Sequence, residues 1–285
     1  MTKIKDYLNL MRIRQWYKNL VVFLAIIFSE KLFDGELFLI SILAFFSLSF
    51  VSSAGYIIND LVDRKKDALH PEKKNRPLAS GKIGLNKAIL ALLLLLIIGL
   101  LIAKSINLTF LLIVILLFVL TQIYTLYLKN VLFADILTIA SLFALRALSG
   151  ALAVDVWVSP WLILCPFFLA LFLVVGKRQA DLSLMKTDGK RTRAILEHYN
   201  KQLTNQLVNF STILLIVSYC LYSFLSEHPT LIYTVPLGIY LIFGFLNLIN
   251  NGSDVARHPE RVFKNKPLVI GMAIWVGLTL SIIYL

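Results

Sequence analysis

Long apolar runs recur along the chain and limit the folds it can adopt. A helix that crosses about 30 Å of hydrocarbon needs about 20 apolar residues. Nine runs approach or reach that length, at residues 20–34, 37–58, 86–103, 107–127, 131–154, 159–176, 207–226, 229–249 and 267–284. The first run is the weakest, because Glu30, Lys31 and Asp34 crowd its end. The pattern predicts an all-α integral membrane protein with nine transmembrane helices, organised as a single domain over residues 1–285.

Charged residues are sparse and unevenly placed. They make up 15% of the 285 residues, against 59% hydrophobic residues, whereas soluble domains carry about a quarter charged residues. When nine spans are threaded, 25 of the 28 Lys and Arg residues fall on the side of the N-terminus. The positive-inside rule then places the N-terminus and the charged loops in the cytoplasm of a multi-pass protein of the cell membrane. This placement accounts for the net charge of +12 without a nucleic-acid partner.

A charged stretch after the second run gathers most of the candidate chemistry. Asn59, Asp63 and Asp67 are spaced four residues apart, and Asp60 joins them at helical spacing, so all four side chains share one broad helix face. Clustered carboxylates repel one another unless a cation lies between them, and hard oxygen ligands combined with substrate phosphates favour Mg²⁺. The alternative is an acidic helix end balanced by the basic residues 64–66.

The second half of this stretch is basic. His70-Pro71 is predicted to end the helix, because the residue before proline avoids the helical conformation. Arg76 precedes P-L-A-S-G at 77–81, a rigid turn that can direct its guanidinium toward phosphate oxygens. A cytoplasmic loop over residues 59–85 would also be basic for topological reasons alone.

Residues 1–19 are predicted to form an amphipathic interfacial segment. Its apolar positions include Ile4 and Leu8, and its basic residues surround Trp16. Arg14 and Lys18 either bind anionic lipid head groups or receive a substrate phosphate, and the sequence leaves both readings open.

Two further polar groups are predicted on the cytoplasmic side of the membrane. The first lies around the link between the fourth and fifth runs and consists of Tyr124, Lys129 and Asp135. The second follows the sixth run and consists of Lys177, Arg178 and Asp181. The second group opens a predicted cytoplasmic loop over residues 177–206. Its cations are suited to phosphate oxygens and its carboxylate to orienting them or binding metal, although a solvated basic loop is the alternative. Arg146 lies inside the fifth run, where a charge costs free energy because it is removed from water, and we favour a structural role for it.

The N-D-x-x-D-x-x-x-D pattern at 59–67, R-P-L-A-S-G at 76–81 and the nine spans resemble the UbiA superfamily of intramembrane prenyltransferases. The resemblance implies nine helices around a central cavity, with acidic motifs that hold Mg²⁺ and a diphosphate at its cytoplasmic mouth. Prenyltransferases of this family carry D-x-x-x-D after the sixth helix. That pair is missing here, because Lys177 precedes Asp181 by four residues and Met185 follows it by four.

Other patterns resemble the branch of decaprenyl-phosphate phosphoribosyltransferases, namely R-x-R-Q-W-x-K-N at 12–19, the acidic motif extended to H-P at 70–71, L-R-A-L-S-G at 145–150 and G-K-R-x-A at 176–180. This resemblance implies a Mg²⁺-dependent glycosyltransferase of the pentosyltransferase type. It would move a 5-phosphoribosyl group from phosphoribosyl diphosphate to a polyprenyl phosphate at the cytoplasmic membrane face and release diphosphate.

The resemblance also implies roles for the polar residues. Metal and diphosphate would be held by Asn59, Asp60, Asp63 and Asp67, and donor phosphates by Arg76, Lys177 and Arg178. The ribose would be positioned by Tyr124 and Asp135, and the lipid phosphate received by Arg14, Lys18 and Lys129.

Two other functions stay open. One is a UbiA-type prenyltransferase that moves an isoprenoid from its diphosphate to an aromatic or other small acceptor. It needs the same binding of Mg²⁺ and diphosphate, because both reactions expel diphosphate from an electron-poor carbon. The extra anions of a phosphoribosyl donor and a lipid phosphate favour the first function, since Lys177 and Arg178 replace a carboxylate. A transporter is disfavoured, because the charges gather at one face rather than at the midplane. The sequence allows a homo-oligomer and does not decide it.

Overall fold

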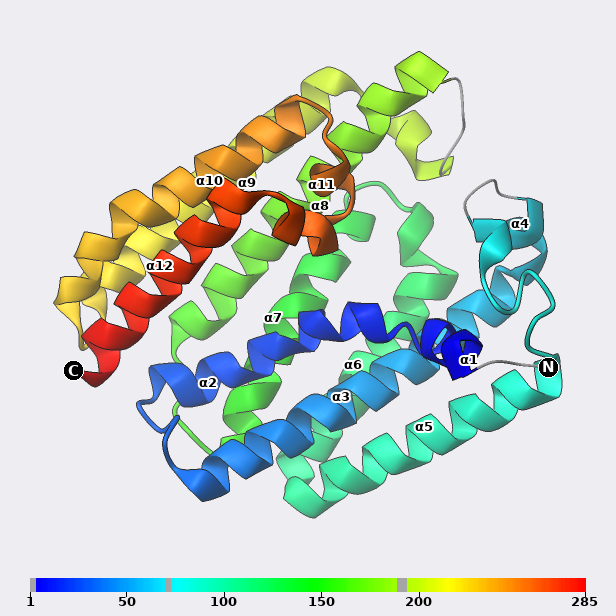
Figure 1. The fold of residues 1–285 in the computed structure, drawn as a ribbon, viewed down its shortest axis with the longest axis horizontal. Coiled ribbons are helices and arrows are strands. Elements are labelled where there is room, and N and C mark those ends of the chain that lie inside the picture. The colour runs from blue at the N-terminus through cyan, green and yellow to red at the C-terminus, as the bar shows by residue number, and fades with distance from the viewer. Residues whose placement is uncertain (1–3, 70–72, 189–193) are drawn as a thin grey trace. The chain divides into compact units, whose positions relative to one another are not determined.

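Eight helical segments among the described residues are long and apolar enough to cross a membrane. The computed structural model describes residues 4–69, 73–188 and 194–285, and no strand occurs in these ranges. The eight segments (Figure 1) are α3 (Gly35–Val62), α5 (Leu85–Ile106), α6 (Leu108–Leu126), α7 (Ala134–Val154), α8 (Pro160–Asp188), α9 (Lys201–Leu225), α10 (Val235–Asn250) with the preceding 3₁₀ helix η5 (Pro229–Thr234), and α12 (Lys266–Tyr284).

The first predicted span is not among these eight. Its residues belong to a 3₁₀ helix, η1 (Ile13–Val22), which continues into α2 (Phe23–Phe28). The helical path ends at Ser29, and Glu30 adopts a positive φ of 61°. The charged residues that weaken this run in the sequence therefore shorten it in the structure, and a count of nine spans is not reached within the described residues.

The remaining elements are short. They are α1 (Ile4–Leu10), α4 (Arg64–Leu69), η2 (Lys73–Asn75), η3 (Leu128–Asn130), η4 (Ala194–His198), α11 (Asp254–Arg257) and η6 (Pro259–Lys264). The predicted helix end at His70-Pro71 and the basic positions 190–193 lie outside the described residues. The N-terminal segment contains two helical elements, α1 and η1, and Arg12 takes the left-handed conformation, with φ of 51°, between them.

The chain divides into two compact units, each described by itself. The first comprises Met1–Tyr127 and Leu145–Val158, and the second comprises Leu128–Ala144 and Ser159–Leu285. Helix α7 contributes its N-terminal half to the second unit and its C-terminal half to the first.

In the first unit, η1, α2, α5 and α6 all contact α3, and Figure 1 shows η1 and α2 alongside this long helix. Buried hydroxyls join these elements, as Ser47 Oγ donates to the Gly99 carbonyl at 2.8 Å and Trp16 Nε1 donates to Ser53 Oγ at 3.0 Å. Such contacts stabilise helix pairs in hydrocarbon, where burial of apolar surface contributes little. The N-terminal segment is thus packed along α3.

Arg146 is held inside this unit by a polar chain. Its Nε donates to Asn19 Oδ1 at 3.0 Å, and Asn19 Nδ2 donates to Ser49 Oγ at 3.1 Å. Asn19 is 2% exposed and Ser49 is fully buried. These contacts give the intramembrane arginine polar partners and support the structural role favoured from the sequence.

Gly150 allows η1 to approach α7 closely. A Cβ atom at this position would lie 2.1 Å from the Val22 carbonyl oxygen, which is backbone and cannot rotate away. We expect Gly150→Ala to lower the free energy of unfolding by about 1–3 kcal/mol, as other overpacked cores do. The midpoint of thermal unfolding in detergent measures the loss. The control is Gly277→Ala in α12, where no atom lies within 4 Å of the added methyl group, and equal midpoints for both variants would contradict this account.

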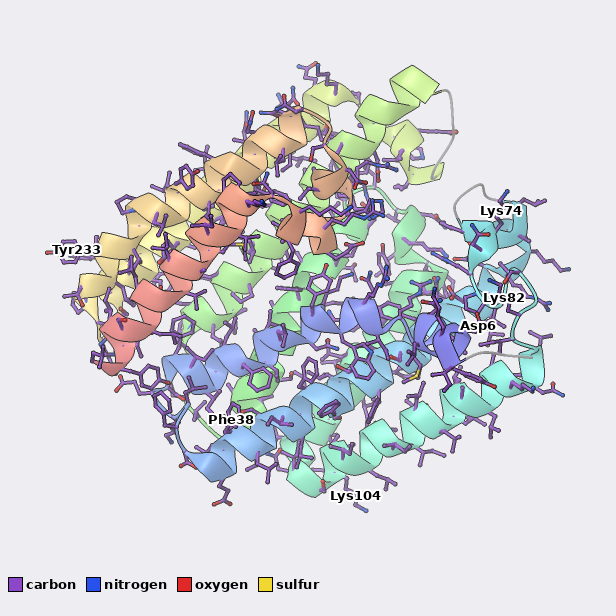
Figure 2. The ribbon with its side chains drawn as sticks, viewed as in Figure 1. Asp6, Phe38, Lys74, Lys82, Lys104 and Tyr233 are labelled. Carbon is purple, nitrogen blue, oxygen red and sulfur yellow. The ribbon has the colours of Figure 1, made fainter. Side chains whose placement is uncertain are left out.

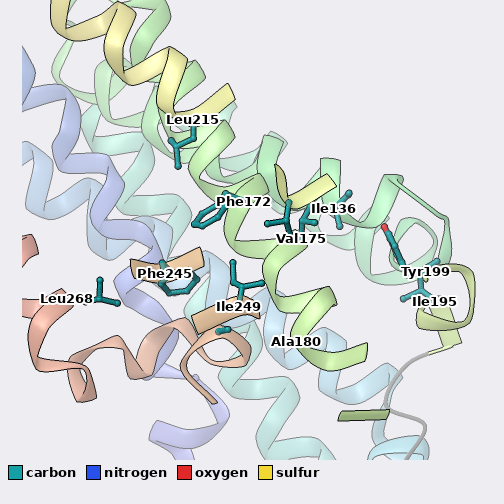
Figure 3. Close-up of a cluster of buried hydrophobic side chains, with 12 residues drawn as sticks. Ile136, Phe172, Val175, Ala180, Ile195, Tyr199, Leu215, Phe245, Ile249 and Leu268 are labelled. Atoms are coloured by element: carbon teal, nitrogen blue, oxygen red, sulfur yellow. The ribbon is translucent and has the colours of Figure 1, made fainter. Parts of the chain in front are cut away.

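The second unit has one main apolar core (Figure 3). Phe172 and Val175 of α8, Val208 and Leu215 of α9, and Phe245 and Ile249 of α10 are buried in it. The rings of Phe172 and Phe245 lie 5.8 Å apart with an interplanar angle of 61°, an edge-to-face geometry that is favourable for aromatic pairs. The core extends through Ala180 to Ile195 and Tyr199, so it reaches the polar residues that follow the sixth predicted run.

Three labelled lysines of the first unit lie at different ends of its helices. Figure 2 shows Lys74 and Lys82 near α4, whereas Lys104 lies at the far end of α5. The acidic motif closes α3 at the end where Lys74 and Lys82 lie. Lys74 and Lys82 therefore lie at the same end of α3 as the acidic motif.

Candidate active site

The acidic motif straddles a break between two helices. Asn59 and Asp60 lie in the last turn of α3, Asp63 is its C-cap, and Asp67 lies in α4. The Asp63 amide donates to the Asn59 carbonyl at 2.9 Å, and the Asp67 amide to the Asp63 carbonyl at 2.8 Å. Helical spacing is thus nearly kept across the break. Asp60 and Asp67 are 2% and 3% exposed, whereas Asn59 and Asp63 are half-buried.

Arg76 joins the two buried carboxylates. Its Nη1 donates to Asp60 Oδ1 at 3.1 Å and to Asp67 Oδ2 at 2.5 Å. Lys73 Nζ lies 3.8 Å from Asp67 Oδ1. The structure therefore brings Asp60 and Asp67 together through Arg76, and the predicted roles of these residues toward metal and phosphate stay predictions.

The rigid turn after Arg76 holds it in place. Leu78 and Ile83 are each 1% exposed and pack in the apolar cluster of the first unit. Arg64 Nε donates to the Leu78 carbonyl at 3.2 Å, and Gly81 takes a φ of 72°, which glycine adopts without strain. The turn is thereby fastened both to the core and to α4, which directs Arg76 back onto the acids.

A second arginine reaches the motif from the N-terminal segment. Arg12 Nη2 donates to Asp60 Oδ1, and its guanidinium lies 5.0 Å from the centroid of the Tyr56 ring. Arg14 and Lys18 are the predicted phosphate ligands of this segment, and Arg12 was not predicted. In the structure Arg14 is exposed, and Lys18 Nζ lies 5.9 Å from the centroid of the Tyr17 ring.

The residues present fit a Mg²⁺ ion that is completed by a ligand. No group of three or more His, Cys, Asp or Glu side chains with metal-binding geometry occurs in the described part of the chain. Mg²⁺ at phosphate-handling sites takes one or two carboxylates together with phosphate oxygens and water. Asp60 and Asp67 supply two carboxylates, and they are close enough to share one cationic nitrogen.

The second unit contains its own buried ion pair. Arg178 Nε donates to Asp135 Oδ2 at 2.9 Å, and the Tyr199 hydroxyl donates to Asp135 Oδ1 at 2.7 Å. Asp135 is 0% and Arg178 1% exposed. Arg178 Nη2 is buried and has no hydrogen-bond partner among the described residues, so one strong donor is left for a ligand.

Tyr199 is a residue that sequence reasoning missed. Burial, followed by its hydrogen bond to Asp135, raises the pKa of the Tyr199 phenol above its ordinary value, so the hydroxyl stays a donor at neutral pH. Nothing in the spacing connects it with Asp135, since 64 residues separate the two. The two residues flank η4 and η3, which contact each other in the fold.

The other predicted residues lie near these contacts or apart from them. Asp181 accepts a hydrogen bond from Arg257 Nε at 3.1 Å, a partner that the sequence did not suggest. Lys177 follows Gly176 in α8 and is half-buried, Tyr124 is half-buried near the end of α6, and Lys129 is half-buried in η3. Their predicted roles toward donor and acceptor stay predictions.

Comparison with known proteins shows the family of this chain. The chain is 29% identical over 297 residues to the decaprenyl-phosphate phosphoribosyltransferase of Mycolicibacterium smegmatis, covering 99% of this chain and 93% of that protein. It is 32% identical over 232 residues to the Corynebacterium glutamicum protein of the same name, covering 77% and 68%. A solved UbiA homolog from Archaeoglobus fulgidus, bound to GPP and Mg²⁺, matches with a TM-score of 0.73 at 20% identity over 98% of this chain and 100% of that one. Residues 20–266 match the model of the UbiA prenyltransferase family, and the chain belongs to that family.

Proposed function

We propose that this protein transfers a 5-phosphoribosyl group from phosphoribosyl diphosphate to a polyprenyl phosphate and releases diphosphate. The observation that carries the proposal is its similarity, over most of its length, to two decaprenyl-phosphate phosphoribosyltransferases. The replacement of a second-motif carboxylate by Lys177 supports it, because a donor with a 5-phosphate and a lipid phosphate acceptor add negative charge to the site.

The reaction makes one bond and breaks one. An oxygen of the lipid phosphate attacks the anomeric carbon of the ribose, and the bond from that carbon to the diphosphate oxygen breaks. The acceptor is already an anion at neutral pH, so no general base has to remove a proton from it. The chain's task is to orient two anions and to stabilise the leaving diphosphate.

The family resemblance implies a role in this task for each of the polar residues. Asp60 and Asp67, with Asn59 and Asp63, would hold Mg²⁺, which when bound neutralises charge on the leaving diphosphate. Arg76, Lys177 and Arg178 would bind donor phosphates. Tyr124 and Asp135 would position the ribose, with Asp135 itself held by Arg178 and Tyr199. Arg14, Lys18 and Lys129 would receive the lipid phosphate.

The charge distribution supports a cytoplasmic site. Basic residues gather at the end of the first unit that carries the acidic motif, and such residues are retained on the cytoplasmic side of membranes. Phosphoribosyl diphosphate is a water-soluble anion, so a site that opens on that side would receive it directly.

Purified protein with a polyprenyl phosphate and ribose-labelled phosphoribosyl diphosphate tests the proposal. We expect label in the lipid extract when Mg²⁺ is present and none when EDTA removes it. A parallel reaction offers geranyl diphosphate with an aromatic acceptor, since the solved A. fulgidus homolog bound GPP. Transfer of the geranyl group without labelling of the lipid phosphate would replace the proposed function by a prenyl transfer.

A further inference from the structure

The acidic pair is fully balanced by cations of the chain itself. Asp60 Oδ1 accepts hydrogen bonds from both Arg12 and Arg76, and Asp67 Oδ2 accepts one from Arg76. The two carboxylates are nearly inaccessible, with 2% and 3% exposure. The arginine side chains are 23% and 27% exposed, so the cations lie on the solvent side of the acids.

These contacts conflict with a metal ion at the same carboxylates. A Mg²⁺ ion binds carboxylate oxygens at about 2.0–2.1 Å and would lie beside two positive guanidinium groups that use the same oxygens. Repulsion between like charges is strong in a partly buried site, where water screens little. Binding of Mg²⁺ alone to these carboxylates is therefore unfavourable unless the two arginine side chains move away from them.

A bound diphosphate would relieve this repulsion between Mg²⁺ and the two guanidinium groups. Guanidinium groups released from carboxylates in a half-buried position need new anionic partners, and the planar arginine fork matches phosphate oxygens as well as it matches carboxylates. The same diphosphate supplies the oxygen ligands that Mg²⁺ lacks at a two-carboxylate site.

We propose that Arg12 and Arg76 hold the position of the metal between Asp60 and Asp67 in the ligand-free protein, and that they exchange these carboxylates for diphosphate oxygens when Mg²⁺ binds. The proposal rests on the proposed function only in taking a diphosphate as the ligand. It adds that metal and diphosphate each bind weakly alone and tightly together, which is a reciprocal coupling of two sites. It also makes Arg12 a diphosphate-binding residue.

The position of Arg12 suits this exchange. It stands at the left-handed turn between α1 and η1, with φ of 51°, 48 residues from Asp60 in the chain. The turn is anchored from both sides, because the Met11 carbonyl accepts a hydrogen bond from Ser53 Oγ and Trp16 donates one to the same hydroxyl. A short movement of the side chain is enough, while the backbone stays on α3.

The test measures metal binding without catalysis. Mn²⁺, which replaces Mg²⁺ at oxygen sites, is titrated into the detergent-solubilised protein and followed by electron paramagnetic resonance, with and without inorganic diphosphate. We expect the wild-type protein to bind Mn²⁺ at least about tenfold more tightly with diphosphate, in the usual range of coupling between sites. Arg76→Gln should bind Mn²⁺ alone at least about tenfold more tightly than the wild type does, and should lose most of the coupling.

Lys65→Gln is the matched control, because it removes one positive charge from the exposed face of α4 without touching the acidic pair. It should leave both affinities within about twofold of the wild type, as an exposed charge does. If Arg76→Gln does not fold, Arg12→Gln replaces it, since Arg12 contacts Asp60 and leaves Arg76 in place. Tight binding of Mn²⁺ alone to the wild type, or unchanged binding in the variant, would overturn the exchange. Failure of phosphoribosyl transfer would leave this result standing, because no ribose donor is used.

Discussion

Replacing Asp67 by asparagine is expected to lower kcat/KM for phosphoribosyl transfer by at least about 100-fold, as loss of one charge-stabilising group in an active site commonly does. Asp67 is 3% exposed and bound to Arg76 at 2.5 Å. Asparagine has nearly the same shape and keeps one oxygen for that contact, but it removes the charge that attracts a divalent cation. The measurement is transfer of labelled ribose to polyprenyl phosphate at saturating and limiting Mg²⁺.

Two controls separate chemistry from folding in the Asp67→Asn variant. The midpoint of thermal unfolding without ligand should fall only slightly, since a neutral hydrogen bond replaces a charge-assisted one of about 1.5–3 kcal/mol. Glu36→Gln removes an equal charge from the exposed first turn of α3, at the other end of the same helix, and should leave turnover unchanged. If Asp67→Asn keeps more than about a tenth of the wild-type rate, Asp67 is not a metal ligand.

Replacing Arg178 by methionine is expected to lower the free energy of unfolding by about 3–5 kcal/mol. The change removes the cationic partner of the Asp135 carboxylate, which is 0% exposed and would keep, among the described residues, the hydroxyl of Tyr199 as its partner. The cost comes from an uncompensated buried charge rather than from the value of the pair itself. Unfolding in mixed micelles, followed by tryptophan fluorescence, measures it.

A second substitution shows whether the stranded charge is the cause. Arg178→Met with Asp135→Leu should recover most of the stability, because it removes the unpaired carboxylate and fills its space with apolar atoms. Arg261→Met is the matched control. Its ion pair with Asp254 has side chains that are 44% and 51% exposed, so its loss should cost less than about 1 kcal/mol. Equal losses for Arg178→Met and Arg261→Met would contradict the burial argument.

The long apolar helices were predictable because the signal for each is local. A run of apolar residues spans hydrocarbon whatever its neighbours are, and eight of the nine predicted runs became helices of sufficient length. The first run did not, because its apolar part is short and its charged end forms a turn. Its residues instead pack along α3 through Trp16 and Asn19, an arrangement that hydropathy does not encode.

The acidic motif was predictable in composition but not in its partners. Helical spacing brought Asp60 and Asp67 to one face, and the structure confirms that these two carboxylates lie together at Arg76. The sequence could not show that Arg12 would join them, since Asp60 is 48 residues away. For the same reason Arg257 was missed as the partner of Asp181.

The sequence by itself determined that this is a helical membrane protein with a family-typical acidic motif, because hydropathy and helical spacing act over a few turns of one helix. Only the tertiary structure decided which cations meet which carboxylates. The pairs of Arg12 with Asp60, Arg178 with Asp135, and Tyr199 with the same aspartate join segments that are distant in the chain. Burial of a charge is tolerated only where such a partner arrives, so the partners emerge from how the helices pack.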